Sequence, residues 1–308
     1  MAVAFIFPGQ GSQYLGMGKE IYESFKEARE VYEEASEGAK VDIAKLSFES
    51  SESELTLTEN AQPAIFTLSM AILRVLRENG FKEEPIAVAG HSLGEFSAAG
   101  AGEVFSVREG AFLVRKRGEF MQEAVPEGIG GMTAVIGLSP EEIEEVLKGI
   151  KEGFVQVANY NSPTQTVISG EIRALERAEE ELRKKGAKKI VRLKVSAPFH
   201  STLMKPAAEK LKEVMEDIEF KPSRYPIINN ADAKVIREPK EVKDSFYRQV
   251  FSSVRWVDDV LKLKELGADK LYEIGPKTVL RGLVRQIDKS LKVISIEKPQ
   301  DIEKVLNG

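Results

Sequence analysis

The order of apolar and amphipathic segments predicts an α/β protein with a mostly parallel sheet and a smaller inserted subdomain. Short apolar runs at residues 2–7 and 85–90 read as buried strands, and segments with helical periodicity follow each of them. Strands that alternate with helices favour a parallel sheet covered on both faces. Further strands near residues 225–229, 270–274 and 292–295 are expected to return to the same sheet. The helices before the insertion are predicted near residues 16–37, 63–78, 93–101 and 107–123.

A different pattern lies in the middle of the chain. After a glycine-rich stretch at residues 126–131, the sequence predicts a β-α-β-β-α-β order. This order is typical of the ferredoxin-like fold, a compact unit that can be inserted at a surface loop of a larger domain. We expect residues 127–195 to form this subdomain, and residues 1–126 and 196–308 to form the catalytic core. Its strands are predicted at 132–137, 154–159, 165–169 and 188–195, and its helices at 140–148 and 171–185.

Composition and charge exclude several classes of function. The 308 residues include no cysteine and two histidines, so disulfides, thiolate metal sites and a cysteine nucleophile are excluded, and no metal is expected. A net charge of −5 argues against a surface that attracts nucleic acid as a whole. The apolar run at residues 2–7 is too short for a signal sequence, and no segment is long enough to span a membrane. We therefore expect a cytoplasmic protein with no nucleic-acid or membrane partner.

A serine motif closes the second predicted strand. Gly90, Ser92 and Gly94 form a Gly-x-Ser-x-Gly pattern directly before the helix predicted at residues 93–101. Small residues at such a place permit a sharp turn that exposes the serine hydroxyl above the sheet. This turn makes the predicted core α/β-hydrolase-like. The alternative is a serine that only caps an ordinary helix.

A serine nucleophile needs a base within hydrogen-bonding distance. His91 is adjacent to Ser92, and neighbouring side chains diverge, so His91 is badly placed to take the serine proton. His200 lies in a predicted loop between the last strand of the subdomain and a helix that begins near Thr202, where catalytic groups are common. We therefore predict Ser92 as nucleophile, His200 as base and a structural role for His91. The alternative for His200 is an ordinary surface histidine.

Several further motifs occur in a fixed order along the chain. They are FPGQGSQ at residues 7–13, GHSLGE at 90–95, Arg117, APFHS at 197–201, and Gln249 before VRW at 254–256. With this combination, and over nearly its whole length, the chain resembles the malonyl-CoA:acyl-carrier-protein transacylases of fatty-acid synthesis.

The resemblance implies an S-malonyltransferase of type II fatty-acid synthesis. Ser92 would take the malonyl group from malonyl-CoA as an ester and pass it to the phosphopantetheine thiol of acyl carrier protein, in ping-pong order. His200 would move the proton, and the backbone carbonyl of Gln249 would orient the imidazole in place of an acidic third residue. No cofactor is implied, because malonyl-CoA is a substrate and phosphopantetheine belongs to the carrier. The expected partners are malonyl-CoA and acyl carrier protein.

The oxyanion of such a reaction needs hydrogen-bond donors that are already in place. The residue after an elbow nucleophile supplies one backbone amide, which here belongs to Leu93. By the resemblance, the second is the amide of Gln10. A competing interpretation of the turn at Gly9 and Gly11 is a dinucleotide-binding loop, but Tyr14 stands at the third glycine position and this pattern fails.

Two residues are expected to set the choice of acyl group. Malonate carries a carboxylate that acetate lacks, and an arginine can bind a carboxylate through two parallel hydrogen bonds. The resemblance identifies Arg117 as that arginine. Phe199, just before the histidine, is similar to the malonyl-selecting pattern of related polyketide acyltransferases, where its ring would crowd a methyl branch. The alternative for Phe199 is an aromatic anchor of its own loop.

The sequence leaves two other functions open. A serine thioesterase or hydrolase would use Ser92 and His200 with water as the acceptor, and a non-catalytic docking protein would keep only the fold. Arg117 and the Gln10 turn favour a transferase with a closed cleft. The basic stretch at residues 183–189 is a candidate docking surface for an acidic carrier protein, or simply a solvated helix end.

Overall fold

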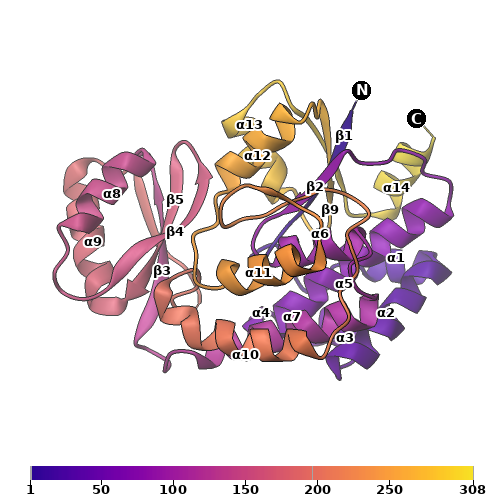
Figure 1. The fold of residues 1–308 in the computed structure, drawn as a ribbon, viewed down its shortest axis with the longest axis horizontal. Coiled ribbons are helices and arrows are strands. Elements are labelled where there is room, and N and C mark those ends of the chain that lie inside the picture. Colours follow the sequence, from indigo (N-terminus) through magenta and orange to yellow (C-terminus); the bar gives the residue numbers. More distant parts are fainter. Residues whose placement is uncertain (1, 196, 308) are drawn as a thin grey trace.

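The computed structural model, which describes residues 2–195 and 197–307, contains two separate β-sheets (Figure 1). The larger sheet has the strand order β10-β9-β1-β2-β7-β8, and all of its neighbouring pairs are parallel except β7 and β8. The predicted α/β fold with a mostly parallel sheet is thus confirmed. Met1, Gly308 and Ser196, where the second core segment was expected to begin, lie outside the described residues. The strands are β1 (Val3–Phe7), β2 (Ala87–Gly90), β7 (Ile227–Ile228), β8 (Val235–Ile236), β9 (Lys270–Ile274) and β10 (Lys292–Ile296).

The central strand β1 is buried on both faces, as its uninterrupted apolar run predicts. Phe5 and Phe7 pack into an apolar cluster with side chains of α2, α5, α6 and α7. Ala4 and Ile6 point into a second cluster with side chains of α12 and α13. Because successive strand residues face opposite sides, the sheet has a helical layer on each face. These helices are α2 (Lys26–Ala39), α5 (Thr58–Glu78), α6 (Leu93–Ala101), α7 (Val107–Glu123), α12 (Trp256–Glu265) and α13 (Val279–Ile287).

The remaining helices of the core are mostly short. The helix expected over residues 16–37 is broken at Phe25, whose backbone is extended with φ −127° and ψ 129°. Helices α3 and α4 and strand β8 were not predicted, because two to seven residues are too few for a periodic pattern. No helix in the described ranges is long and apolar enough to cross a membrane. This group comprises α1 (Lys19–Ser24), α3 (Ile43–Glu49), α4 (Glu52–Thr56), α10 (Lys205–Glu216), α11 (Pro239–Gln249) and α14 (Pro299–Leu306), with a 3-10 turn at Thr202–Met204.

Helix α5 begins at Thr58, earlier than the start at residue 63 that its proline suggested. Pro63 has no N–H, so it cannot bond the carbonyl of Glu59 four residues before it. Nη1 of Arg115 on α7 donates to that carbonyl at 2.9 Å instead. The carbonyl that Pro63 leaves without its helical partner is thus bonded by a side chain of another helix.

The smaller sheet is antiparallel and belongs to the inserted segment. Its strand order β4-β5-β3-β6, with two connecting helices, is the ferredoxin-like order, and this prediction is confirmed. The last strand is shorter than predicted and ends at Arg192. We propose the division into residues 127–195 and a core of 1–126 and 196–308 because Figure 1 places the small sheet and its helices to one side of the larger sheet. The elements are β3 (Gly130–Ile136), α8 (Pro140–Lys148), β4 (Val155–Ser162), β5 (Gln165–Glu171), α9 (Ile172–Lys185) and β6 (Lys189–Arg192).

Candidate active site

Ser92 lies at a sharp turn between β2 and α6, at the carboxyl end of the parallel sheet. Its backbone has φ 53° and ψ −110°, and its side chain makes no capping hydrogen bond to the helix. The glycines on either side permit close backbone approach: a Cβ on Gly90 would lie 1.9 Å from the carbonyl oxygen of Gly94, and a Cβ on Gly94 would lie 2.1 Å from that of Phe7. The motif therefore forms the strained turn that exposes a serine hydroxyl.

The hydroxyl of Ser92 lies within hydrogen-bonding distance of His200. Ser92 Oγ is 2.7 Å from Nε2 of His200, and Nδ1 of His200 is 3.0 Å from the backbone oxygen of Gln249. A carbonyl oxygen only accepts hydrogen bonds, so Nδ1 carries the hydrogen and Nε2 accepts from the serine hydroxyl. The structure thus brings together three predicted site residues from a strand-to-helix turn, a loop and the last residue of α11.

His200 is held in its neutral form. Its side chain is buried, and burial together with the nearby charge of Arg117 lowers its pKa to about 3. An imidazole that is neutral at neutral pH can accept the serine proton.

His91 has other partners, as expected for a structural residue. Its Nε2 lies 2.7 Å from Oδ1 of Asn161, and its ring lies 5.8 Å from the ring of Trp256. Burial lowers the pKa of His91. His91 also lines the pocket beside Ser92, which the sequence did not predict.

Arg117 is buried next to Ser92, with 1% of its surface exposed. Its Nη2 donates to Ser92 Oγ at 3.1 Å and to Oε1 of Gln249 at 2.8 Å. Its Nη1 donates to Oε1 of Gln62 at 2.7 Å, and the sequence had assigned no role to this glutamine. Within the part of the chain that is described, Nε of Arg117 has no hydrogen-bond partner.

The charge of Arg117 is only weakly compensated. Burial lowers its pKa to about 9, and the negative charge of Glu95 opposes this shift, so Arg117 stays protonated at neutral pH. The guanidinium also lies over the ring of Phe96, 5.1 Å from its centre. The result is a buried cation whose direct partners are neutral groups.

A pocket of about 350 Å³ opens beside these groups. Five of the predicted residues line it: Gln10, Ser92, Arg117, Phe199 and His200. Leu93 is buried as the first residue of α6, which places its backbone amide at the N-terminus of that helix. Gln249 is buried behind the pocket.

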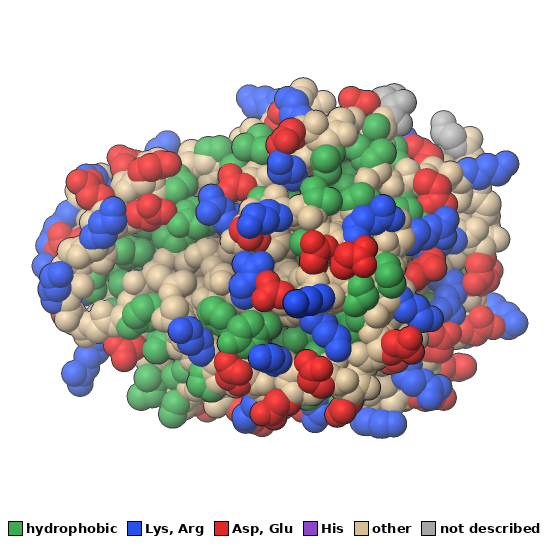
Figure 2. All heavy atoms as spheres, in the orientation of Figure 1, with side chains coloured by type: hydrophobic (Ala, Val, Ile, Leu, Met, Phe, Trp, Pro, Cys, Tyr) green, Lys and Arg blue, Asp and Glu red, His purple; other side chains and the backbone are tan. Residues whose placement is uncertain are grey.

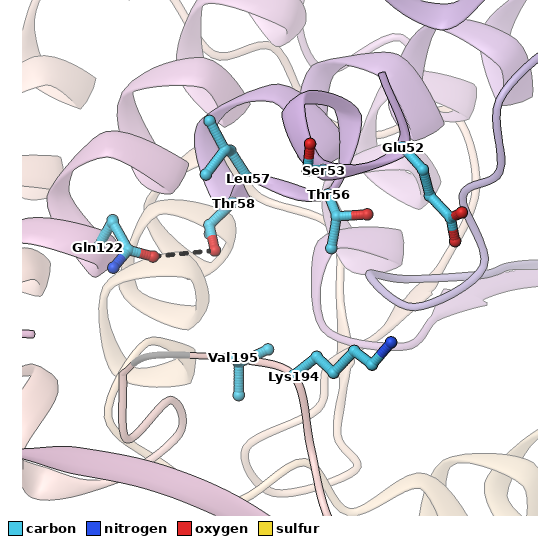
Figure 3. Close-up of a pocket in the computed structure, with 8 residues that line it drawn as sticks. All are labelled: Glu52, Ser53, Thr56, Leu57, Thr58, Gln122, Lys194 and Val195. Carbon is cyan, nitrogen blue, oxygen red and sulfur yellow. Dashed lines mark hydrogen bonds between the residues drawn. The ribbon is translucent and has the colours of Figure 1, made fainter. Parts of the chain in front are cut away.

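A second pocket of about 440 Å³, drawn in Figure 3, has four lining residues in common with the first and therefore adjoins it. Gln122 and Thr58 lie on its wall and are joined by a hydrogen bond of 3.3 Å. Thr58 also accepts a hydrogen bond of 3.2 Å from the side chain of Gln10. The second pocket therefore leads toward the turn beside Ser92. The two pockets share Glu52, Thr56, Lys194 and Val195.

Asn230 is a site residue that the sequence did not reveal. Its Oδ1 accepts from the backbone N–H of Ser92 at 2.7 Å, and its Nδ2 donates to the backbone oxygen of Gly90 at 2.7 Å. One side chain thus holds both sides of the turn. Asn230 stands in no motif with Ser92, from which it is 138 residues away, so only the folded chain shows the contact.

The site defines the class of protein. A serine on a strand-to-helix turn, bonded to a neutral histidine, is the arrangement of α/β enzymes that carry an acyl group as a serine ester. Among the described residues there is no cluster of three or more histidine, aspartate or glutamate side chains suited to a metal ion. Within this class the chain belongs to the acyl transferase domain family, which matches residues 4–302.

Named relatives are similar over almost the whole chain. The malonyl CoA-acyl carrier protein transacylase of Bacillus subtilis is 45% identical over 98% of this chain and 95% of its own length. The solved transacylase from Xanthomonas oryzae pv. oryzae is 40% identical, with a TM-score of 0.96 over 100% of this chain and 99% of that one. A malonyl-transacylase solved in complex with a type II polyketide-synthase acyl carrier protein is also 40% identical, with a TM-score of 0.97 over the same shares.

The positive φ of Ser92 predicts a difference in stability between two variants that both lack the hydroxyl. Glycine adopts this backbone conformation freely, whereas alanine keeps the strain, which is worth about 1 to 3 kcal/mol against a glycine entropy cost of about 0.5 to 1 kcal/mol. Ser92→Gly should therefore be more stable than Ser92→Ala, with a melting temperature about 2 °C higher in thermal unfolding. A melting temperature of the glycine variant equal to or below that of the alanine variant would show that the backbone at Ser92 is not strained.

The low pKa of His200 predicts a flat pH profile. Because the folded imidazole stays neutral well below its ordinary pKa of 6.5, kcat/KM for acyl transfer should show no inflection near 6.5 between pH 5 and 8. The unfolded chain does bind a proton there, so the free energy of unfolding should fall as the pH drops below about 6.5. Circular dichroism at each pH controls for unfolding. A decline in kcat/KM with a midpoint near 6.5 in folded protein would refute this prediction.

Proposed function

We propose that this protein transfers the malonyl group from malonyl-CoA to the phosphopantetheine thiol of acyl carrier protein, in type II fatty-acid synthesis. The observation that carries the proposal is the buried, charged Arg117 at 3.1 Å from the hydroxyl of Ser92. A cation beside the nucleophile suits an acyl group that ends in a carboxylate. The names of the relatives agree with this reaction.

The first half-reaction forms a malonyl ester. Ser92 Oγ attacks the thioester carbonyl while Nε2 of His200 takes the serine proton, and the Gln249 carbonyl keeps the imidazole oriented. The backbone amides of Leu93 and Gln10 are proposed to bind the oxyanion of the tetrahedral intermediate. The C–S bond then breaks, and the proton on His200 passes to the departing sulfur to give free coenzyme A.

The second half-reaction reverses these steps with a different thiol. The phosphopantetheine thiol of the carrier gives its proton to His200 and attacks the malonyl ester. The C–O bond to Ser92 breaks, the serine regains its proton, and malonyl-carrier protein leaves. The serine oxygen carries the acyl group and the phosphopantetheine belongs to the carrier, so the proposed reaction needs no cofactor of its own.

Arg117 and Phe199 are proposed to select the acyl group. Nε of Arg117 has no hydrogen-bond partner among the described residues, and a malonate carboxylate would supply an acceptor in a pocket that the guanidinium lines. Phe199 is 5% exposed and lines the same pocket, so its ring limits the space for a branched acyl group. An acetyl group would leave the buried cation without an anion.

The second pocket is proposed to take the pantetheine arm that both substrates share. It adjoins the pocket of Ser92, and its wall carries the polar side chains of Thr58 and Gln122 (Figure 3). An arm with two amide groups suits polar walls of this kind. We also propose that the protein acts in the cytoplasm, because coenzyme A thioesters are highly charged and do not cross membranes freely.

The structure gives little support for carrier docking at the basic stretch of residues 183–189. Its ion pairs join Arg183 to Glu179, Lys184 to Glu181 and Lys185 to Glu145. Basic and acidic side chains are interspersed over the face seen in Figure 2. Because local carboxylates offset these cations, the ion pairs favour a solvated helix end.

Trapping of the acyl-enzyme tests the reaction directly. After brief exposure to malonyl-CoA, intact-mass measurement should show one malonyl group on the wild type and none on Ser92→Ala. Added holo-carrier protein should remove the group faster than buffer alone does. Rapid loss to water without transfer would instead indicate a hydrolase, and full transfer by Ser92→Ala would exclude Ser92 as the nucleophile.

Replacement of Arg117 tests the choice of substrate. Arg117→Ala should lower the preference for malonyl-CoA over acetyl-CoA by about 10- to 100-fold, the value of one charged hydrogen-bonded contact. Arg115→Ala is the matched control, because Arg115 lies on the same helix and bonds the Glu59 carbonyl instead of the site. We expect Arg115→Ala to lower stability and leave the preference unchanged. An unchanged preference in Arg117→Ala would refute the proposed role.

A further inference from the structure

The side chain of Gln249 makes a second set of contacts, separate from its backbone bond to His200. Its Oε1 accepts from Nη2 of Arg117 at 2.8 Å. Its Nε2 donates to Oε2 of Glu95 at 2.8 Å, to the backbone oxygen of Ser92 at 2.9 Å and, at the longer distance of 3.3 Å, to Oδ1 of Asn230. The carboxamide therefore stands between a buried cation and a buried carboxyl group.

Glu95 is fully buried and is surrounded by hydrogen-bond donors. Its Oε1 accepts from the hydroxyl of Ser245 at 2.5 Å, and its Oε2 accepts from the backbone N–H of Asn230 at 3.0 Å as well as from Gln249. Burial raises the pKa of Glu95, while these donors and the charge of Arg117 act in the opposite direction. The partners favour an acceptor at this position.

The contacts fix which way the carboxamide of Gln249 faces. With Nε2 toward Glu95 and the Ser92 oxygen, Oε1 must face Arg117. In the reversed orientation, Oε1 would face three acceptors, including Oδ1 of Asn230, and the NH2 group would face the guanidinium, so all four hydrogen bonds of the carboxamide would be lost. Glu95 is thus one of three acceptors that together turn Oε1 of Gln249 toward Arg117, and it is the one that carries a carboxyl group.

Glu95 is also linked to Arg117 through charge. The hydrogen bonds of Arg117 go to neutral groups, yet the charge of Glu95 opposes the loss of the Arg117 proton. The carboxamide of Gln249 is the group that connects the two. Neither Glu95 nor this carboxamide takes part in the proton transfers at Ser92 and His200.

We propose that Glu95 is a positioning residue for acyl selection: through the carboxamide of Gln249 it holds the Arg117 guanidinium in the orientation that receives a malonate carboxylate. This inference rests on the proposed function. It extends the machinery of selection to a residue that does not line the pocket of Ser92.

Two replacements of Glu95 distinguish a role in orienting Gln249 and Arg117 from a role in filling the buried space. Glu95→Gln can keep an oxygen toward Gln249 and Asn230 and turn its NH2 toward Ser245, whose hydroxyl can also accept. Glu95→Met has a similar size and no comparable acceptor. In the assay, malonyl-CoA and acetyl-CoA are mixed and compete for Ser92. Intact-mass measurement then gives the ratio of malonyl to acetyl ester on the protein. This ratio does not depend on the fraction of protein that is folded.

We expect Glu95→Met to lower the malonyl-to-acetyl ratio by about 10-fold, and Glu95→Gln to stay within about threefold of the wild type. Ser245→Ala is the matched control, because it removes one buried hydrogen bond to Glu95 on the side away from Gln249. Its ratio should equal that of the wild type even where its melting temperature is lower.

Gln249→Met gives a second test if Glu95→Met does not fold. It removes the carboxamide and keeps the backbone carbonyl that bonds His200, so its ratio should fall by about 10-fold as well. An unchanged ratio in the folded methionine variants, an equal loss in Glu95→Gln, or an equal loss in Ser245→Ala would each overturn the proposal. A wild type without malonyl preference would instead contradict the proposed function itself.

Discussion

The burial of the Arg117 charge is the constraint to which the rest of the site responds. Removing a cation from water costs several kcal/mol unless partners replace the lost hydration. Here the direct partners are the neutral side chains of Gln62 and Gln249, the serine hydroxyl and the face of Phe96, and the pKa of Arg117 is still lowered to about 9. A site built in this way favours a ligand that brings a negative charge, and it penalises one that fills the pocket without such a charge.

The inserted segment holds the loop of His200 in place. The side chain of Gln156 on β4 donates to the backbone oxygen of His200 at 3.1 Å and accepts from the N–H of Thr202 at 3.2 Å. The backbone of His200 has φ 54°, a conformation that a non-glycine residue keeps only when its surroundings impose it. Backbone hydrogen bonds between Val254 and β4 fasten the subdomain to the core. His200 is therefore positioned by β4 of the smaller sheet and by α11 of the core together.

The sequence predicts well those helices whose ends are set by residues close by in the chain. The predicted bounds of α6 and α7 agree with the structure because glycines and serine mark where each helix begins: Ser92 precedes α6, and Ser106 forms a capping box with Glu109 on α7. In the first turns of α5, by contrast, the partner of the Glu59 carbonyl is Arg115, which lies 56 residues further along the chain. No local pattern contains that contact.

In the candidate site, too, some residues could be predicted from the sequence and others only from the folded chain. Ser92 and His200 could be proposed from a motif and from the presence of only two histidines, and Arg117, Gln10 and Gln249 from a resemblance. The roles of Asn230 and of the Gln249 side chain come from hydrogen bonds across 138 and 154 residues. Such contacts depend on how the sheet brings distant turns together, and one sequence gives no signal for them.

The two halves of the site are coupled through charge. After burial, the charge of Arg117 is the largest cause that lowers the pKa of His200. In the proposed reaction a malonate carboxylate on Arg117 brings an opposite charge to the same place, so the pKa of His200 rises toward its ordinary value when that substrate is bound. A base with a pKa nearer the working pH drives proton transfer better. An acetyl thioester brings no such charge, so the proposed selection by Arg117 would act on the proton transfer as well as on binding.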